Sequence, residues 1–483
     1  MLFALNIQAY ANNQHKIAEE MLTNPFLKAM SICKGTVSIL DAGCVVYSRI
    51  WCIFELFKSV MGGNSDYEFD VYTDRGTNRA VGITHGYIPS DGGESDYKKH
   101  REKEFSLDKI LQAMKVDVKH AQASVESDRR FILNTITGLS VDDAVMDDHA
   151  NYDKLNNILR GIFVTPALQR IIKEMDVDSI TRCLDIVRAS STSIIDLDLQ
   201  HCSRFDDDIL MKLADSLPPT LTEFTLISRR SSVTINGMNK SVGQIAQCPQ
   251  LKKLFLSWND IVDDGAKQIA DALKDNKSLE SLVLSKNNMG SDGAKMIADA
   301  LKINQTLTLL DMNENNIGDD GAKQIADALK INHSLKILML SKNNMGSDGA
   351  KMIADALKIN QTLTLLDINE NNIGDDGAKQ IADLLIDNHS IESLILGSNK
   401  IGDDGAKQIA DALKGSHSLK VLFLNGNNIG AEGAKQIADA LKDNHSIEEL
   451  DLGSNKIGVE GKGYLSKIKK ELKAVHRYVY IHC

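Results

Sequence analysis

A repeat of 28 residues constrains this chain more than any other feature of its sequence. Leucine-like residues recur at positions 251, 279, 307, 335, 363, 391, 419 and 447. Each opens an L-x-x-L-x-L-x-x-N segment, which continues as N-x-I/M-G-x-x-G-A-K-x-I-A-D-x-L in all copies but the last. Two degenerate copies precede them, IIDLDLQHC from Ile194 and LTEFTLISR from Leu221. About ten units of one kind predict a stack in which each unit contacts its neighbours.

Each repeat joins a strand pattern to a helix pattern. Leu254 and Leu256 alternate with other residues, so both point to one side of a strand. Ala266, Ile269 and Leu273 fall at i, i+3 and i+7, on one face of a helix. Neither half can bury its apolar side alone. Stacking therefore predicts a parallel sheet inside and helices outside, with right-handed connections.

Recurring asparagines and aspartates have structural explanations. Asparagine occupies positions 259, 287, 315, 343, 371, 399, 427 and 455, where a buried amide can satisfy backbone groups at each turn. Aspartate precedes the G-A-K motif at Asp264, Asp320, Asp376 and Asp404. We expect these four carboxylates to cap the helices and to interact favourably with the helix dipoles.

The period, the asparagine and the helix pattern resemble leucine-rich repeats of the ribonuclease-inhibitor type, over residues 190–458. The resemblance implies an α/β horseshoe of about ten repeats, each of about 28 residues. LSKNNMGSDGAKMIADALKINQTLTLLD occurs twice, 56 residues apart. Such copying extends a scaffold and argues against a unique catalytic group within the array.

The concave, strand side of the array is the predicted binding surface, because exposed strand positions are where the repeats differ. The residues that we expect to contact a protein ligand there are Phe255, Trp258, Val283, Lys286, Asp311, Glu314, Met339, Lys342, Asp367, Glu370, Ile395, Phe423 and Asp451. Neighbouring strands lie about 4.8 Å apart, so these positions form one surface. Its large apolar groups alternate with carboxylates, a pattern that suits a protein partner, with Phe255, Trp258 and Phe423 as anchors.

Charge narrows the class of partner. The chain has 55 basic and 66 acidic residues and a net charge of −11, which disfavours nucleic acid. Residues 251–458 contain 22 Lys against 31 Asp and Glu, a net of −9, so a basic or mixed-charge protein is favoured. Residues 459–483 are net +4, and we expect them to form a helical cap with a solvated basic face.

The rest of the composition indicates a protein of the cytoplasm, with the nucleus as an alternative. No apolar run reaches about 18 residues, so neither a membrane span nor a membrane partner is expected, and the N-terminus lacks the pattern of a signal peptide. Seven scattered cysteines form no C-x-x-C pair, which favours a reducing compartment. His476, His482 and Cys483 have no metal-ligand spacing, so we expect no metal and no cofactor.

Residues 1–185 predict a separate α/β domain. Strand patterns occupy 1–9, 35–41, 67–73 and 79–87, and helix patterns occupy 48–61, 106–114, 124–139 and 151–164. The string S-R-I-W-C-I-F-E-L (48–56) is similar to the S-x-W-C-x-x-E-L stretch of Toll/interleukin-1 receptor domains. This resemblance implies a diverged or incomplete domain of that kind, or a flavodoxin-like one. It also implies NAD cleavage by Glu55, although Trp51 and Glu55 also suit an ordinary core and its edge.

Three functions follow from these patterns and resemblances. The first is a non-enzymatic scaffold or receptor that binds a protein ligand, in intracellular signalling or innate-immune-type recognition. The second is a GTPase activator, because Ran GTPase-activating proteins are built from this repeat class. The array has no arginine between Arg230 and Arg477, so an arginine finger must come from its flanks. The third is an NAD hydrolase that depends on Glu55.

Overall fold

The computed structural model describes residues 107–123, 126–140, 142–474 and 477–483, together with four strands closer to the N-terminus. The chain divides into two compact units, Met1–Ile195 and Asp196–Cys483. The predicted helix over 48–61, with Trp51 and Glu55, lies outside the described residues, as does His476. The resemblance to Toll/interleukin-1 receptor domains therefore stays a prediction.

The first unit contains a four-stranded sheet and four described helices. The strands are β1 (Ala4–Asn6), β2 (Gly35–Leu40), β3 (Glu68–Asp74) and β4 (Ala80–Gly82), in that order. Strands β1 to β3 are parallel and β4 is antiparallel to β3. The helices are α4 (Leu107–Ala113), α5 (Glu126–Thr137), α6 (Ala150–Glu174) and α7 (Val177–Ala189).

The predicted helices over 106–114, 124–139 and 151–164 are confirmed, with one difference in length. Helix α6 continues past Pro166 to Glu174, ten residues beyond the predicted end. Buried Leu168, Ile171 and Ile172 supply tertiary packing that outweighs the single backbone hydrogen bond a proline removes. Helix α7 was not predicted; its N-cap is Asp176, whose carboxylate accepts the backbone N–H of Ser179 at 2.9 Å.

The second sheet of the protein has eleven strands, which follow one another in sequence order from β5 to β15. Its strands are β5 (Ile194–Asp198), β6 (Glu223–Ile227), β7 (Lys253–Phe255), β8 (Ser281–Val283), β9 (Leu309–Asp311), β10 (Ile337–Met339), β11 (Leu365–Asp367), β12 (Ser393–Ile395), β13 (Val421–Phe423), β14 (Glu449–Asp451) and β15 (Tyr480–His482). The pairs from β6 to β15 are parallel. The two degenerate repeats therefore supply β5 and β6, as predicted.

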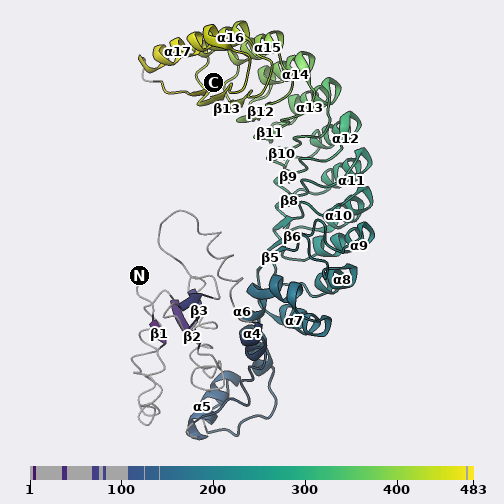
Figure 1. Ribbon diagram of the computed structural model, residues 1–483, viewed down its shortest axis with the longest axis vertical. Coiled ribbons are helices and arrows are strands. Elements are labelled where there is room, and N and C mark those ends of the chain that lie inside the picture. Colours follow the sequence, from purple (N-terminus) through teal and green to yellow (C-terminus); the bar gives the residue numbers. More distant parts are fainter. Residues whose placement is uncertain are drawn as a thin grey trace. The chain divides into compact units, whose positions relative to one another are not determined.

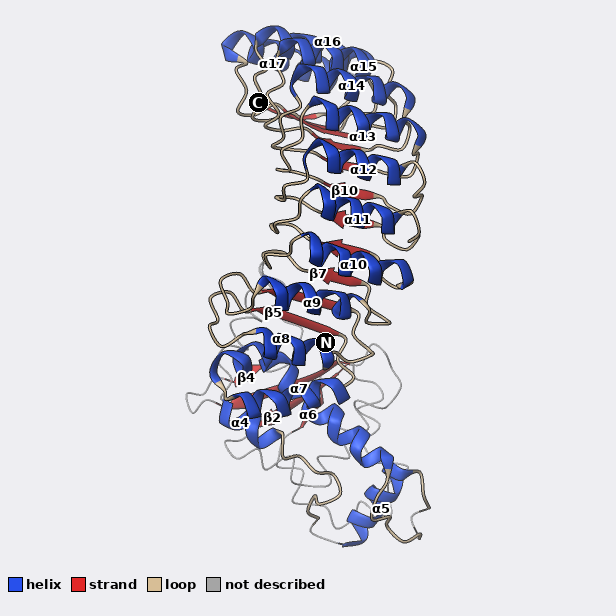
Figure 2. Cartoon of the chain, turned by 90° about the vertical axis from the view of Figure 1, so that its right-hand side faces the viewer, coloured by secondary structure: helices blue, strands red, loops and turns tan. Residues whose placement is uncertain are grey.

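A helix follows each strand from β5 to β14. These helices are α8 (Asp207–Asp215), α9 (Ile235–Ala246), α10 (Asp263–Asp275), α11 (Ser291–Leu301), α12 (Gly318–Leu329), α13 (Ser347–Ile359), α14 (Gly374–Asp387), α15 (Asp403–Leu413), α16 (Ala431–Asp443) and α17 (Gly458–Ala474). Within the array the strands line the inner side of a curve and the helices its outer side (Figures 1 and 2). This is the predicted α/β horseshoe.

The core lies between the two layers. In β7, Leu254 is fully buried while Lys253 and Phe255 lie on the other side of the strand. In α10, Ala266, Ile269 and Leu273 are buried, as their spacing predicts. Every repeat from β7 to α16 reproduces this arrangement, which is why the repeats stack without a break.

Two ladders of buried asparagines connect the repeats. In the predicted ladder, the Asn427 amide donates to the carbonyls of Leu396 and Leu424 (both 2.9 Å), and its oxygen accepts N–H groups of Asn399 and Ile401 (2.8 and 3.0 Å). A second ladder, at Asn276, Asn304, Asn332, Asn360, Asn388 and Asn444, follows the helix ends and was not singled out in the sequence. Both ladders satisfy buried backbone groups that the short strands leave without partners.

The prediction that Asp264, Asp320, Asp376 and Asp404 cap helices was wrong. All four lie in the first turns of their own helices, where a carboxylate interacts favourably with the helix dipole, as expected. The capping bonds come from the residue before each, and they reach the next helix of the array. Asp319, for example, accepts the backbone N–H groups of Gly346 and Gly349, both at 2.8 Å, at the start of α13. Asp263, Asp375 and Asp403 do the same for α11, α15 and α16.

Where a repeat lacks that aspartate, the helix of the next repeat starts differently. Ser291, Ser347 and Ala431 occupy its position, and the helices that follow begin at Gly318, Gly374 and Gly458. These glycines have φ of 63°, 60° and 66°, a left-handed conformation that glycine adopts without steric cost. Two kinds of repeat therefore alternate through the copied region.

The C-terminal segment adds a strand to the sheet. After α17, the expected cap helix, β15 pairs with β14: the Leu452 N–H donates to the His482 carbonyl and the Tyr480 N–H to the Glu448 carbonyl, both at 2.8 Å. Ile481 is buried against the core side. The leucine pattern does not predict β15, because VYIHC lacks the repeat motif.

Candidate functional site

The side of the sheet away from the helices carries two rows of partly exposed residues, which we call the strand face. The first row is Lys253, Ser281, Leu309, Ile337, Leu365, Ser393, Val421 and Glu449. The second row is Phe255, Val283, Asp311, Met339, Asp367, Ile395, Phe423 and Asp451. Strand register places successive members of each row directly beside each other.

The structure brings the second row together as the sequence predicts. It also adds the first row, whose central members Leu309, Ile337 and Leu365 form an apolar strip on three neighbouring strands. The sequence could have predicted the first row, because residues two apart on a strand share a face. The strand face is therefore more apolar at its centre than the second row alone indicates.

The remaining predicted contact residues lie just beyond the strands, in a turn that recurs in every repeat. Their φ angles are positive: 63° at Trp258, 56° at Lys286, 52° at Glu314, 53° at Lys342 and 48° at Glu370. A left-handed conformation costs a residue with a Cβ about 1–2 kcal/mol. The stacked repeats impose it, since each of these N–H groups donates to a carbonyl of the next repeat.

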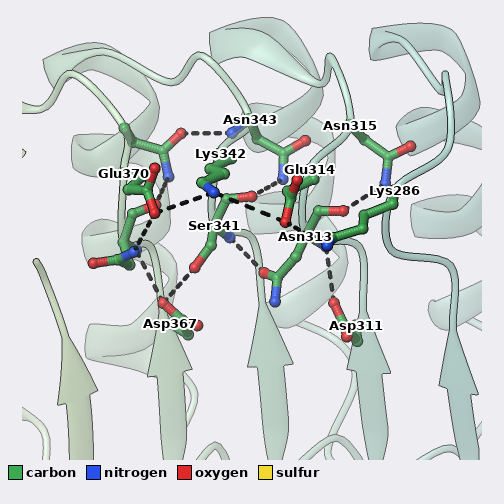
Figure 3. A network of polar contacts seen from close by, with 12 residues as sticks. Lys286, Asp311, Asn313, Glu314, Asn315, Ser341, Lys342, Asn343, Asp367 and Glu370 are labelled. Carbon is green, nitrogen blue, oxygen red and sulfur yellow. Dashed lines mark hydrogen bonds and ion pairs between the residues drawn. The ribbon is translucent and has the colours of Figure 1, made fainter. Parts of the chain in front are cut away.

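These turn residues form a ladder of charge along the rim of the sheet. Lys286 lies 3.4 Å from the Glu314 carboxylate, and Lys342 lies 3.9 Å from Glu314 and 3.2 Å from Glu370 (Figure 3). The charges alternate along the array, so neighbours compensate each other. Partly exposed pairs of this kind contribute about 0–1 kcal/mol each, so the ladder orders side chains more than it stabilises the fold.

Trp258 forms the N-terminal end of this ladder. The Arg229 guanidinium carbon lies 4.2 Å from the ring centroid and the Lys286 ammonium nitrogen lies 4.3 Å from it. The ring of Trp258 therefore already contacts two cationic side chains of its own chain. Phe255 and Phe423, which are partly exposed on the strand face, are in the better position to anchor a partner.

Asp311 and Asp367 carry the central negative charge of the strand face. Each accepts the backbone N–H two residues on, from Asn313 and Asn369, at 2.9 Å, and Asp367 also accepts the Ser341 hydroxyl at 2.6 Å. Burial is the main cause that raises the pKa of the Asp311 carboxyl, and the charges of Asp367 and Glu314 raise it further. The other aspartate of the row, Asp451, has the His482 ring 2.8 Å away.

The described residues offer little for catalysis or metal binding. Burial raises the pKa of the Cys183 thiol to about 12 and that of Cys248 to about 11, so neither thiol is an activated nucleophile. No three His, Cys, Asp or Glu side chains in this part of the chain gather to hold a metal ion. The helices described here also include none that is long and apolar enough to span a bilayer.

Comparisons with known proteins agree with this architecture. A family model described as "Leucine Rich repeat" matches eight segments: 247–270, 275–298, 304–326, 332–354, 360–382, 387–410, 415–438 and 443–462. No curated protein matches the chain.

Two solved structures are similar at low scores. One is the actin-binding site 2 of leiomodin-1, at 21% identity and a TM-score of 0.28, covering 32% of this chain and 94% of that one. The other is the complex of Rad7 and Elc1 in yeast, at 14% identity and a TM-score of 0.28, covering 64% and 89%. Neither likeness bears on what this chain binds. The eight matched segments coincide with the repeats from β7 to α17, and residues 247–462 are an array of leucine-rich repeats.

Proposed function

We propose that the repeat array is a non-enzymatic scaffold that binds a protein partner on its strand face. The observation that carries this proposal is the continuous row from Phe255 to Phe423, in which partly exposed apolar side chains adjoin carboxylates on neighbouring strands. Partly exposed aromatic and aliphatic groups on a rigid sheet lose little conformational entropy when a partner covers them. Intracellular signalling and innate-immune-type recognition are the processes that the family resemblance suggests for such a scaffold.

The test is a comparison of strand-face and helix-side variants of the full chain. Phe255→Asp combined with Phe423→Asp places charge at both apolar ends of the strand face, and Met352→Asp places one on the exposed side of α13 as a control. We expect affinity capture from lysate to recover a protein with wild type and the control but not with the double variant. In calorimetry, the purified partner should then bind wild type and the control with similar affinity and the double variant much more weakly. Equal capture by all three folded proteins would contradict the proposal.

The GTPase-activator alternative depends on the arginines that flank the array. Arg229 stacks on Trp258, and the Arg477 guanidinium donates to the Leu441 carbonyl at 2.7 Å, so both are engaged within the chain. An arginine finger must be free to reach a nucleotide phosphate, and of these flanking arginines Arg230 is the exposed one. Stimulated GTP hydrolysis by a Ran-like GTPase would establish this function, and its absence would exclude it.

The NAD-hydrolase alternative depends on Glu55, outside the described residues. Release of nicotinamide by the wild-type chain, and its loss in Glu55→Ala, would support it. No release from wild type would dismiss it.

A further inference from the structure

The centre of the strand face holds two carboxylates for which the described part of the chain supplies no ion-pair partner. Asp311 on β9 and Asp367 on β11 both lie beside Met339 on β10 in strand register. At about 4.8 Å between strands, the two positions are separated by about 10 Å. Among the described residues, no lysine, arginine or histidine nitrogen forms an ion pair with either carboxylate.

The nearest lysines are already engaged. Lys286 and Lys342 pair with Glu314 and Glu370 in the rim ladder (Figure 3). At the C-terminal end of the second row of the strand face, His482 lies beside Asp451. The rim glutamates Glu314 and Glu370 therefore have lysine partners, and Asp451 has a histidine beside it, whereas the central Asp311 and Asp367 have no such partner among the described residues. Burial of Asp311 disfavours its ionised form in the free chain, so a cation supplied from outside would relieve a cost.

The surroundings indicate what kind of cation fits. Leu309, Ile337 and Leu365 line the neighbouring row, and Val283 and Ile395 flank the carboxylates in their own row. A Lys or Arg side chain has an apolar stem that can pack on such groups while its charged head reaches a carboxylate. Arginine is favoured, because a guanidinium presents donors on several sides.

Two other ligand classes fit poorly. A metal ion bound by both carboxylates needs their oxygens within about 5 Å of each other, since each metal–oxygen distance is about 2.4 Å. Asp311 and Asp367 stand two strands apart, and in the part of the chain that the structure describes no three His, Cys, Asp or Glu side chains gather to hold a metal ion. Nucleic acid would be repelled, because the array carries a net charge of −9, from 22 Lys and 31 Asp and Glu between 251 and 458.

We propose that the strand face over β9 to β11 receives an arginine or lysine of the protein partner, seated over Met339 between Asp311 and Asp367, with apolar residues of the partner on either side. This inference rests on the proposed function and specifies the chemistry of the partner.

A phage-displayed library of random peptides, selected on the full chain, tests the inference without knowledge of the natural partner. We expect the enriched peptides to share a basic residue flanked by apolar ones. The double variant Asp311→Asn, Asp367→Asn keeps the size of both side chains. It should bind such peptides about tenfold or more weakly, as measured by fluorescence anisotropy. Asp320→Asn, in the first turn of α12, removes one acidic charge elsewhere and should leave binding unchanged.

The outcomes separate this inference from the proposed function. Peptides without a basic residue, or equal binding by the double aspartate variant, would overturn the inference. If the enriched peptides nevertheless failed to bind the double variant Phe255→Asp, Phe423→Asp, the proposed function would stand. Peptides unaffected by either pair of changes would contradict both. Failure to enrich any peptide on the wild-type chain would count against the basic-residue site as well.

Discussion

At the scale of single residues, Asp319 shows how a side chain can serve a repeat other than its own. Its carboxylate bonds the first turn of α13, and Gly349 leaves the space that this approach needs, because a Cβ there would lie only 2.6 Å from the Asp319 oxygen. The sequence pattern predicts a capping aspartate in this motif, but it indicates Asp320 and not Asp319. The choice between adjacent aspartates depends on how one repeat stacks on the next, which spacing within a repeat does not contain.

Asp319→Ala should lower the free energy of unfolding by about 1 kcal/mol, since two capping hydrogen bonds at a helix N-terminus are lost. Asp320→Ala is the matched control, with the same change one residue later and no bond to the next helix. It should cost a few tenths of a kcal/mol through the helix dipole. Urea denaturation monitored by circular dichroism measures both. Equal losses in the two variants would show that charge, and not capping, is responsible.

Asp311→Asn should make the array more stable at neutral pH, by up to about 1 kcal/mol, the size of ordinary cross-strand effects. Burial, Asp367 and Glu314 raise the pKa of the Asp311 carboxyl in the folded chain above 3.8, so the folded state holds its proton to higher pH than the unfolded state does. Wild-type stability therefore falls as pH rises through that window, whereas an amide does not titrate.

Urea denaturation of wild type and Asp311→Asn at about pH 7 and about pH 4 checks this expectation. The gain should shrink at the lower pH, where a larger share of the Asp311 carboxyl in the folded chain is protonated and uncharged. A less stable Asn variant at neutral pH would contradict it. Paired with the loss of peptide binding, a stability gain would mean that this carboxylate serves binding at the expense of stability.

At the scale of elements, the short strands depend on the asparagine ladders. Asn427→Ala removes a buried amide that makes four hydrogen bonds to neighbouring backbone, and should cost about 3 kcal/mol or more, because the backbone groups stay buried without partners. Asn428→Ala, at the exposed neighbouring position, should change stability by less than about 0.5 kcal/mol. Thermal and urea unfolding of the pair give the comparison, and similar losses would argue against the ladder.

The elements that the sequence predicts best are those that repeat. Eight copies in register define their strands and helices, because each copy supports the others with the same alternation and the same helix spacing. Prediction failed where a single copy stood alone. The end of α6 was placed before Pro166, and β15 was not recognised, since only its place beside β14 in the structure identifies Tyr480–His482 as a strand.

At the scale of the whole molecule, the array should tolerate a change of length in whole pairs of repeats. Deletion of residues 335–390 joins Ser334 to Ile391, and the same N-H-S triplet precedes Leu335 and Ile391 in the native chain. We expect a folded protein with an unchanged helical signal per residue in circular dichroism. Its urea m-value should be smaller, in proportion to the surface removed.

Deletion of residues 335–376 serves as the contrast, because it joins Ser334 to Gly377 and removes β10, α13 and β11, which is not a whole number of repeats. That protein should lose cooperative unfolding. A cooperative fold in this variant, or an unfolded chain after the paired deletion, would contradict the nearest-neighbour description of the array. The horseshoe itself was predictable from the period. The charge ladder was not, although its members stand 28 residues apart, because the positive φ of each turn residue decides where its side chain points.

The cations beside Trp258 give the protein a built-in optical signal. The sequence has only two tryptophans, and Trp258 is the one in contact with both the Arg229 guanidinium and the Lys286 ammonium. A charge beside an indole ring shifts the energy of its excited state, so the emission wavelength of Trp258 depends on both cations. In a Trp51→Phe background it is the sole tryptophan. Its fluorescence should then change colour when a ligand on the strand face displaces Lys286, and report occupancy without any attached label.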